Sequence, residues 1–558
     1  MEHSILSWIR QRQKQYYSQD WTEFFWLIGL LLAAIVLFGV QLDNLPLRDW
    51  DEATVAQVAK EIWLAGIGER HWLFPTLWGE PYMNKPPLVH NFIALSYALG
   101  GVNEWTARLP GAMLTATSVP LLYKIGREIF TSRPPAIFTA LIYLTLLPVV
   151  RHGRLAMLDG AVLCFEMLMI WCTLRARRDM RWALGIGISF GLICLTKGMM
   201  GLLIAAIVIL FLAWDTPRLL SSIYLWLGLF LGSCPVISWY LAQWFNYSQV
   251  FLDTAIFNQS LQRIWSPVEN HQGPFWYYLL EIVKYSCPWL LFFVLGVQQA
   301  WENRHWGWGK LILVWIGVYL GCVSIMATKL PWYIMPVYPA LALAGGTKIA
   351  QIYELDSTED YPRYWSVFLV VLGLATSAGS IYFAMTATEE PSLAVILAAV
   401  ALTMGISAVM VRRRDRQFIS MLIWGMYVSL LLFVSSPHWN WELNEAYAVK
   451  PIARLIQLST PPQTKIYTSF DYERPSLNFY SERQVLPPSS QDLEILAEEF
   501  PYLSPEELKW KWLKLYWKKE SQPFLLLFTD QLDKLEVESV IPIGNDQSNL
   551  TLITKHIN

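Results

Sequence analysis

Residues 24–40, FFWLIGLLLAAIVLFGV, form an apolar stretch that contains no charged side chain. A helix that crosses the hydrocarbon core of a membrane needs about 20 predominantly apolar residues, with a range of roughly 17–25. Because no small-residue cleavage site follows this stretch, we expect a retained membrane-spanning helix rather than a signal peptide. Residues 1–23 carry Arg10, Arg12 and Lys14 and are predicted to form a cytoplasmic N-terminus.

Apolar runs of this kind recur along the chain, and we predict thirteen spanning helices. The runs after the first are 108–130, 134–150, 156–174, 182–196, 199–214, 221–240, 276–298, 311–327, 331–349, 366–386, 393–411 and 418–436. Of the 558 residues, 54% are hydrophobic and only 15% are charged, whereas soluble proteins carry about 25% charged residues. We therefore predict a mainly α-helical, polytopic membrane protein. This composition excludes disordered, coiled-coil and small disulfide-rich proteins.

Charge and cysteine placement exclude further classes. The formal net charge of −2 gives no electrostatic reason to expect nucleic acid as a partner. The cysteines all fall inside apolar runs, at positions 164, 172, 194, 234, 287 and 322. A disulfide framework and a cysteine-based zinc site are therefore not expected.

The orientation of the chain depends on a short apolar run at 87–100. As a helix this run rises only ~21 Å, against a hydrocarbon core of about 30 Å, so we expect it to lie along the interface. Most Lys and Arg residues of the short loops then fall on the side of the N-terminus, as the positive-inside rule requires. We predict a transmembrane domain at 24–436 with a cytoplasmic N-terminus. Its long outer loops are predicted at 41–107 and 241–275.

The C-terminal region, 437–558, changes to a polar composition and is predicted to form a small soluble α/β domain on the outer, periplasmic side. The segments 465–470 and 523–529 have the pattern of strands, and 491–499 and 505–517 have the pattern of helices. A bacterial inner membrane is the predicted location.

Ionisable side chains gather at the outer ends of the predicted spans. A charge at bilayer depth is costly to insert, so it is a functional candidate. The carboxylates are Asp51, Glu52 and Asp159, and the cations are Lys85, Arg154, Lys197 and Lys329. A carboxylate can remove a proton from an acceptor, and fixed cations can stabilise negative charge on a departing phosphate. This set of residues is suited to displacing a phosphate from carbon.

Each of these residues also has a simpler interpretation. Asp51 could cap the helix that begins near it. Lys85, which precedes two prolines, could be an interfacial anchor. His271 lies close to Glu269, and one such pair is more typical of loop hydrogen bonding than of a metal site.

Six motifs follow one another in a fixed order. They are Asp51-Glu52, Lys85-Pro-Pro-Leu, Arg154 with Asp159, Leu195-Thr-Lys197-Gly, His271-Gln-Gly-Pro-Phe-Trp-Tyr-Tyr and Lys329-Leu-Pro-Trp-Tyr333-Ile-Met-Pro336. In these motifs the chain resembles GT-C superfamily glycosyltransferases, in particular the branch of lipid A aminoarabinose transferases and protein O-mannosyltransferases. The resemblance covers about residues 40–350. Thr54-Val55 and Asn84 depart from the aminoarabinose transferase pattern, so the sugar and the acceptor stay open.

The resemblance implies a GT-C-type helical bundle with interfacial helices in the first outer loop. It implies inverting transfer of a sugar from a polyprenyl-phosphate donor to a lipid, glycan or protein acceptor, among membrane lipids. The implied catalytic residues are Asp51, Glu52 and Asp159, and the implied donor-phosphate ligands are Lys85, Arg154, Lys197, Lys329 and Tyr333. His271 is a candidate for substrate or metal binding. No cofactor is assigned, and a divalent metal is left open.

Two other functions compete with sugar transfer. A transporter or lipid flippase would line a pathway with the charged groups and use the tail as an accessory domain. Such proteins often contain internal repeats, which we do not find in this sequence. A receptor or scaffold would instead use the tail as a binding module.

Overall fold

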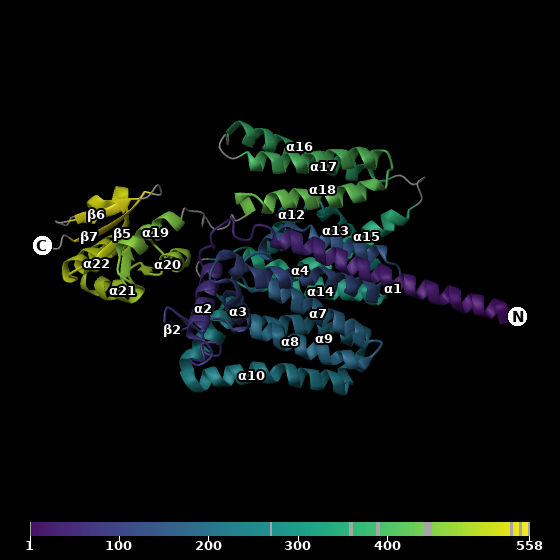
Figure 1. Cartoon of the computed structure of the whole chain (residues 1–558), viewed down its shortest axis with the longest axis horizontal. Helices are drawn as coiled ribbons and strands as arrows, with labels where there is room; N and C mark the ends of the chain where they lie inside the picture. The colour runs from purple at the N-terminus through teal and green to yellow at the C-terminus, as the bar shows by residue number, and fades with distance from the viewer. Residues whose placement is uncertain are drawn as a thin grey trace. The chain divides into compact units, whose positions relative to one another are not determined.

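The computed structural model describes residues 2–267, 271–355, 361–386, 391–439, 449–535, 540–545 and 549–555. The chain divides into two compact units. The first, which we call the helical unit, contains Met1–Asn44, Trp72–Pro75 and Tyr82–Trp439. The second, which we call the α/β unit, contains Leu45–His71, Thr76–Pro81 and Asn440–Asn558. Figure 1 labels many of the elements of both units.

The first half of the helical unit runs from α1 to α10. Its α-helices are α1 (Glu2–Gly39), α3 (Leu88–Gly100), α4 (Glu104–Ile129), α5 (Pro134–Leu144), α6 (Leu147–His152), α7 (Asp159–Ala176), α8 (Ala183–Lys197), α9 (Met200–Asp215) and α10 (Ile223–Phe251). Two short 3₁₀ helices, η1 (Met180–Trp182) and η2 (Pro217–Ser221), lie between them.

The second half of this unit begins with a π-helical segment, η3 (Leu252–Leu261). The α-helices that follow are α11 (Gln262–Trp265), α12 (Tyr277–Tyr285), α13 (Leu290–Glu302), α14 (Gly307–Ile325), α15 (Tyr338–Glu354), α16 (Arg363–Thr386), α17 (Ser392–Arg412) and α18 (Gln417–Val434). The 3₁₀ helices η4 (Pro331–Val337) and η5 (Pro437–Trp439) complete it. Helices α16, α17 and α18 lie side by side in Figure 1.

Among the described residues, seven helical stretches are long and apolar enough to cross a membrane. They are Trp21–Gly39, Met180–Lys197, Ile223–Trp265, Gly307–Ile325, Arg363–Thr386, Ser392–Arg412 and Gln417–Val434. This agrees with a multi-pass membrane protein. The predicted run 134–150 is divided into α5 and α6, and the run 276–298 is divided between α12 and α13. The total of thirteen spans and the orientation stay predictions.

Close helix packing in this unit depends on glycine. A Cβ atom added at Gly187 would strike the backbone of Gly228, and one added at Gly191 would strike the backbone of Gly232. Helices α8 and α10 therefore approach each other through paired small residues, which is the usual way for helices to associate in a membrane. This contact fixes α8, which carries Lys197 at its last residue.

The α/β unit is built on a five-stranded sheet with the order β4-β3-β5-β7-β6. Its strands are β3 (Lys465–Thr468), β4 (Gln484–Leu486), β5 (Phe524–Phe528), β6 (Val540–Asn545) and β7 (Leu550–Lys555). Strand β3 is parallel to both β4 and β5, and β7 is antiparallel to both β5 and β6.

Helices cover both faces of this sheet. They are α19 (Val449–Ser459), α20 (Pro475–Ser481), α21 (Ser490–Glu499) and α22 (Pro505–Lys519), and a 3₁₀ helix, η6 (Thr529–Leu535), follows β5. On β5, Leu526 packs in the core that includes α19, whereas Leu525 and Leu527 pack with Trp510 and Leu513 of α22. The alternation follows the two-residue period of a strand. The predicted helices 491–499 and 505–517 lie within α21 and α22, and the predicted strands 465–470 and 523–529 contain β3 and β5 and extend past them.

The α/β unit also contains part of the first outer loop. This part holds α2 (Asp51–Ala65) and a two-stranded ribbon of β1 (Thr76–Leu77) and β2 (Glu80–Pro81). Helix α2 packs against α20, and eight of its residues are buried. The sequence analysis assigned the whole loop 41–107 to the transmembrane domain. Residues of α2 contact α20, which lies more than 400 positions further along the chain, and this part of the loop groups with the C-terminal region.

Candidate functional site

The predicted acidic pair lies at the start of α2. Helix α2 begins at Asp51 itself, and its N-cap position is Trp50, so Asp51 is not the capping residue. The Asp51 side chain is exposed. Glu52 is fully buried, and its carboxylate accepts the backbone N–H of Arg48 at 2.8 Å. Of the pair, Asp51 is the one accessible to a substrate.

Asp49, two residues before Asp51, is buried and tightly held. Its carboxylate accepts hydrogen bonds from the backbone N–H of Ser476 at 2.9 Å and from the Ser476 hydroxyl. The guanidinium of Arg474 lies 3.4 Å away. Burial raises the pKa of Asp49, and its contacts with Ser476 and Arg474 oppose that rise.

In the helical unit, the structure brings together three of the predicted residues. Lys197, the last residue of α8, pairs with Asp159, the first residue of α7, at an Nζ–Oδ1 distance of 2.7 Å. The side chains are 12% and 3% exposed, so this is a largely buried ion pair. The Lys197 ammonium also lies 5.7 Å from the ring centroid of Tyr333. The Tyr333 hydroxyl in turn accepts a hydrogen bond from Arg263 at 2.8 Å.

Lys329 and His271 meet through the backbone. The N–H of Lys329 donates to the carbonyl of His271 at 2.9 Å. The Lys329 ammonium donates to the carbonyls of Val323 and Ser324 at 3.1 Å and 2.7 Å, near the C-terminal end of α14. That end carries partial negative charge, which a lysine stabilises. The ammonium also lies 5.4 Å from the ring of Tyr278.

Arg154 lies in a different cluster. It is fully buried, and its guanidinium donates to backbone carbonyls at the ends of α1 and α18. The acceptors are Leu37, Val40, Gln41 and Val434. Arg154 and Arg108 each make a cation–π contact with Trp439, at 4.8 Å and 5.0 Å. The contacts of Arg154 join helix ends, and its predicted role as a phosphate ligand stays a prediction.

Lys85 is half-buried in the turn before α3. The two prolines after it, Pro86 and Pro87, lead directly into Leu88, the first residue of that helix. Pro87 occupies the N-cap position. The turn therefore holds Lys85 next to the apolar segment predicted to lie along the interface.

The sequence analysis missed a buried carboxylate, Glu166, on α7. Its Oε1 accepts the indole N–H of Trp315 at 2.9 Å, and the same N–H also lies 2.9 Å from the carbonyl of Pro336. Trp315 of α14 thereby links Glu166 of α7, the helix that carries Asp159, to Pro336 of η4, the helix that carries Tyr333. A glutamate inside the apolar run 156–174 was the available signal, since such residues are rare in spans.

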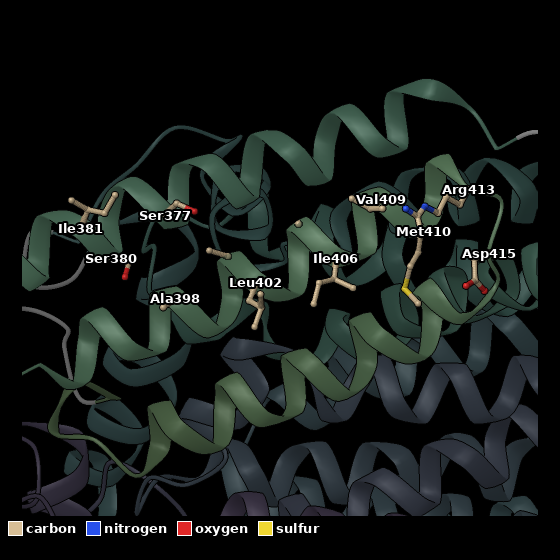
Figure 2. A pocket seen from close by; sticks show the side chains of 12 residues that line it. Ser377, Ser380, Ile381, Ala398, Leu402, Ile406, Val409, Met410, Arg413 and Asp415 are labelled. Atoms are coloured by element: carbon tan, nitrogen blue, oxygen red, sulfur yellow. The ribbon is translucent and has the colours of Figure 1, made fainter.

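Two other features lie apart from these residues. A groove between α16 and α17 is lined mainly by apolar and small side chains, with Arg413 and Asp415 at one end (Figure 2). It contains none of the predicted site residues. Within the described ranges, no three His, Cys, Asp or Glu side chains gather as a metal site requires, so no residues are assigned to a divalent metal.

The chain is similar to known glycosyltransferases. The family described as dolichyl-phosphate-mannose-protein mannosyltransferase matches residues 84–240, which include Lys85, Arg154, Asp159 and Lys197. The undecaprenyl phosphate-alpha-4-amino-4-deoxy-L-arabinose arabinosyl transferase 1 of Pseudomonas fluorescens Pf-5 is 29% identical over 64% of this chain and 66% of that protein. An uncharacterized protein of Aquifex aeolicus is 28% identical over 66% of this chain and 72% of that protein.

Among solved structures, ArnT from Cupriavidus metallidurans bound to undecaprenyl phosphate superposes with a TM-score of 0.74 at 20% identity. The match covers 95% of this chain and 98% of that one. At this identity the likeness shows the fold. Together these matches confirm the resemblance to GT-C glycosyltransferases. The alignments with the first curated relatives span 62–66% of those proteins' length.

Proposed function

We propose that the protein is an integral-membrane glycosyltransferase of a bacterial inner membrane. It transfers a sugar from a polyprenyl-phosphate donor to a lipid, glycan or protein acceptor on the outer face. The observation that carries the proposal is the buried pair of Asp159 and Lys197 beside Tyr333. Asp159, Lys197 and the predicted donor ligand Lys85 all lie within residues 84–240, which the family matches. The N-terminus is cytoplasmic and the α/β unit is periplasmic in this proposal.

The lipid-linked donor is supported by the relatives, whose names specify undecaprenyl phosphate-linked aminoarabinose as the substrate. In the reaction, an acceptor hydroxyl or other nucleophile attacks the anomeric carbon of the sugar. The bond between that carbon and the phosphate oxygen breaks, and the configuration inverts. The proton of the acceptor goes to the carboxylate of Asp51, which acts as the general base.

The leaving group is a polyprenyl phosphate, which gains negative charge as the bond breaks. Lys85 and Lys197 are assigned to stabilise that charge, since cations in a water-poor site act strongly on a departing oxyanion. The Lys197 ammonium has three N–H donors, so the phosphate can bind it while Asp159 stays paired. Before the donor binds, Asp159 holds Lys197 in place.

The test is a transfer assay with purified protein, a panel of radiolabelled undecaprenyl-phosphate sugars and a crude membrane fraction as acceptor. Asp51→Asn and Lys85→Ala are compared with wild type. Glu69→Gln, which changes an exposed carboxylate of the same loop, is the matched control. We expect transfer of one sugar, loss of transfer in both test variants and normal transfer in the control.

Two results would overturn the proposal. If folded wild-type protein transfers no sugar but moves the donor lipid across a vesicle membrane, the protein is a flippase. If Asp51→Asn transfers at the wild-type rate, Asp51 is not the base.

A further inference from the structure

The position of Asp51 depends on a strained turn. Trp50, directly before it, has φ 61° and ψ −106°, a backbone conformation that non-glycine residues adopt only when their surroundings impose it. The turn is closed by hydrogen bonds from Ala53 to the carbonyl of Arg48 at 3.0 Å and from Thr54 to the carbonyl of Trp50 at 2.9 Å. The buried Glu52 carboxylate holds the N–H of Arg48. These local bonds hold one side of the turn.

The other side of the turn is held by residues 472–480 of the C-terminal region. Asp49 is bound by Ser476 and Arg474, as described above. The ring of Trp50 lies 5.6 Å from the ring of Tyr472. The N–H of Leu47 donates to the hydroxyl of Tyr480 at 2.7 Å. Each residue from 47 to 50, apart from Arg48, thus has a described contact with this segment.

Of these contacts, the one at Asp49 has the highest cost of burial, because it buries a carboxylate. Its side chain is 1% exposed and that of Arg474 is 16% exposed. A buried carboxylate is costly unless it is fully paired, and replacing such pairs by apolar groups is often neutral for stability. Burying Asp49 is therefore costly, and burial also raises the pKa of its carboxyl. This cost is consistent with contacts that serve to fix the geometry of the turn.

We propose that Ser476 and Arg474 are positioning residues that set the orientation of Asp51 through Asp49. This inference rests on the proposed function, in which Asp51 is the general base. It makes the C-terminal region part of the catalytic apparatus, because the turn that presents Asp51 is completed by residues 425–427 positions further along the chain.

The experiment measures transfer kinetics and thermal unfolding of the full-length protein with Ser476→Ala, Arg474→Ala, Arg474→Lys and Asp49→Asn. A base displaced by about 1 Å costs on the order of 100-fold in rate, so we expect kcat to fall by about 10- to 100-fold in the two alanine variants. The KM for the donor should stay close to wild type. The unfolding temperature should stay close to wild type in Ser476→Ala, whereas Arg474→Ala should lower it because it removes one partner of a buried ion pair. Arg474→Lys, which keeps the charge, should recover part of the rate.

Two comparisons make the test specific. Lys534→Ala removes an exposed ion pair with Glu506 in the same unit and should keep wild-type kinetics. The kcat of the double variant Asp49→Asn with Arg474→Ala should fall no further than that of the worse single variant, because both changes remove the same contact.

Wild-type kcat in Ser476→Ala and Arg474→Ala would overturn the inference. So would a parallel fall of kcat and unfolding temperature in all variants, which would indicate a merely structural role. Asp51→Asn, measured beside them, separates the two proposals. If it is inactive while Ser476→Ala is normal, only the positioning role fails, and if it is fully active, the proposed base fails.

Discussion

Replacing Lys197 with methionine would leave the carboxylate of Asp159 without its ion-pair partner. The carboxylate is 3% exposed, so water cannot solvate it fully. Removing one partner of a buried pair typically costs about 3–5 kcal/mol of stability. Asp159 is the first residue of α7, and the helix dipole there offsets about 0.3–1 kcal/mol. We therefore expect a net loss of about 2–4 kcal/mol in the free energy of unfolding.

The assay is denaturant unfolding of the detergent-solubilised protein, followed beside sugar transfer and donor binding. The double variant Asp159→Asn with Lys197→Met removes both charges and should recover most of the lost stability. It should not recover donor affinity, because the proposed phosphate ligand is still absent. Between the single and the double variant, the free energy of unfolding should thus recover while the donor affinity stays low.

Either of two results would refute this argument. An unchanged free energy of unfolding in Lys197→Met would show that the pair is not effectively buried. Wild-type donor affinity in the double variant would show that Lys197 does not bind the phosphate.

Two further predictions concern the other charged clusters. Arg154→Leu leaves several buried carbonyls without a donor and should reduce the free energy of unfolding by about 3 kcal/mol or more, whereas donor affinity measured on the folded fraction should not change. A lower donor affinity at unchanged stability would instead make Arg154 a phosphate ligand. Burial raises the pKa of Asp49, so the folded chain binds a proton there more tightly than the unfolded chain. As pH falls from neutral to about 4, the unfolding temperature of wild type should rise relative to that of Asp49→Asn; identical pH dependence in both would contradict this.

The elements that local patterns specify could be predicted from the sequence. The run 24–40 forms the end of α1, and the short apolar run within 523–529 forms β5. Both follow from the length or period of apolar residues, which depends on neighbouring positions only. The division of 134–150 was missed, although Pro148 lies at the second residue of α6, because apolar composition alone does not report a break in the backbone.

The contacts between distant segments could not be predicted. Asp49 and Ser476 are 427 positions apart, and no local pattern relates them. In the sequence, Arg154 and Lys197 look alike, since both are cations at the outer ends of predicted spans. What separates them is the nature of their partners, which only the folded structure supplies.

Those partners bear on which cation can accept the donor phosphate. Lys197 is paired with a carboxylate. Its ammonium has three N–H donors, so a phosphate can bind it while that carboxylate stays paired. Lys329 and Arg154 are bound to backbone carbonyls, and moving either cation to a phosphate would leave those buried acceptors unsatisfied, at a cost of about 1–3 kcal/mol each. Binding of the phosphate beside Asp159 avoids this cost. For this reason Lys197, more than Arg154 or Lys329, is suited to bind the phosphate and to release it after each transfer.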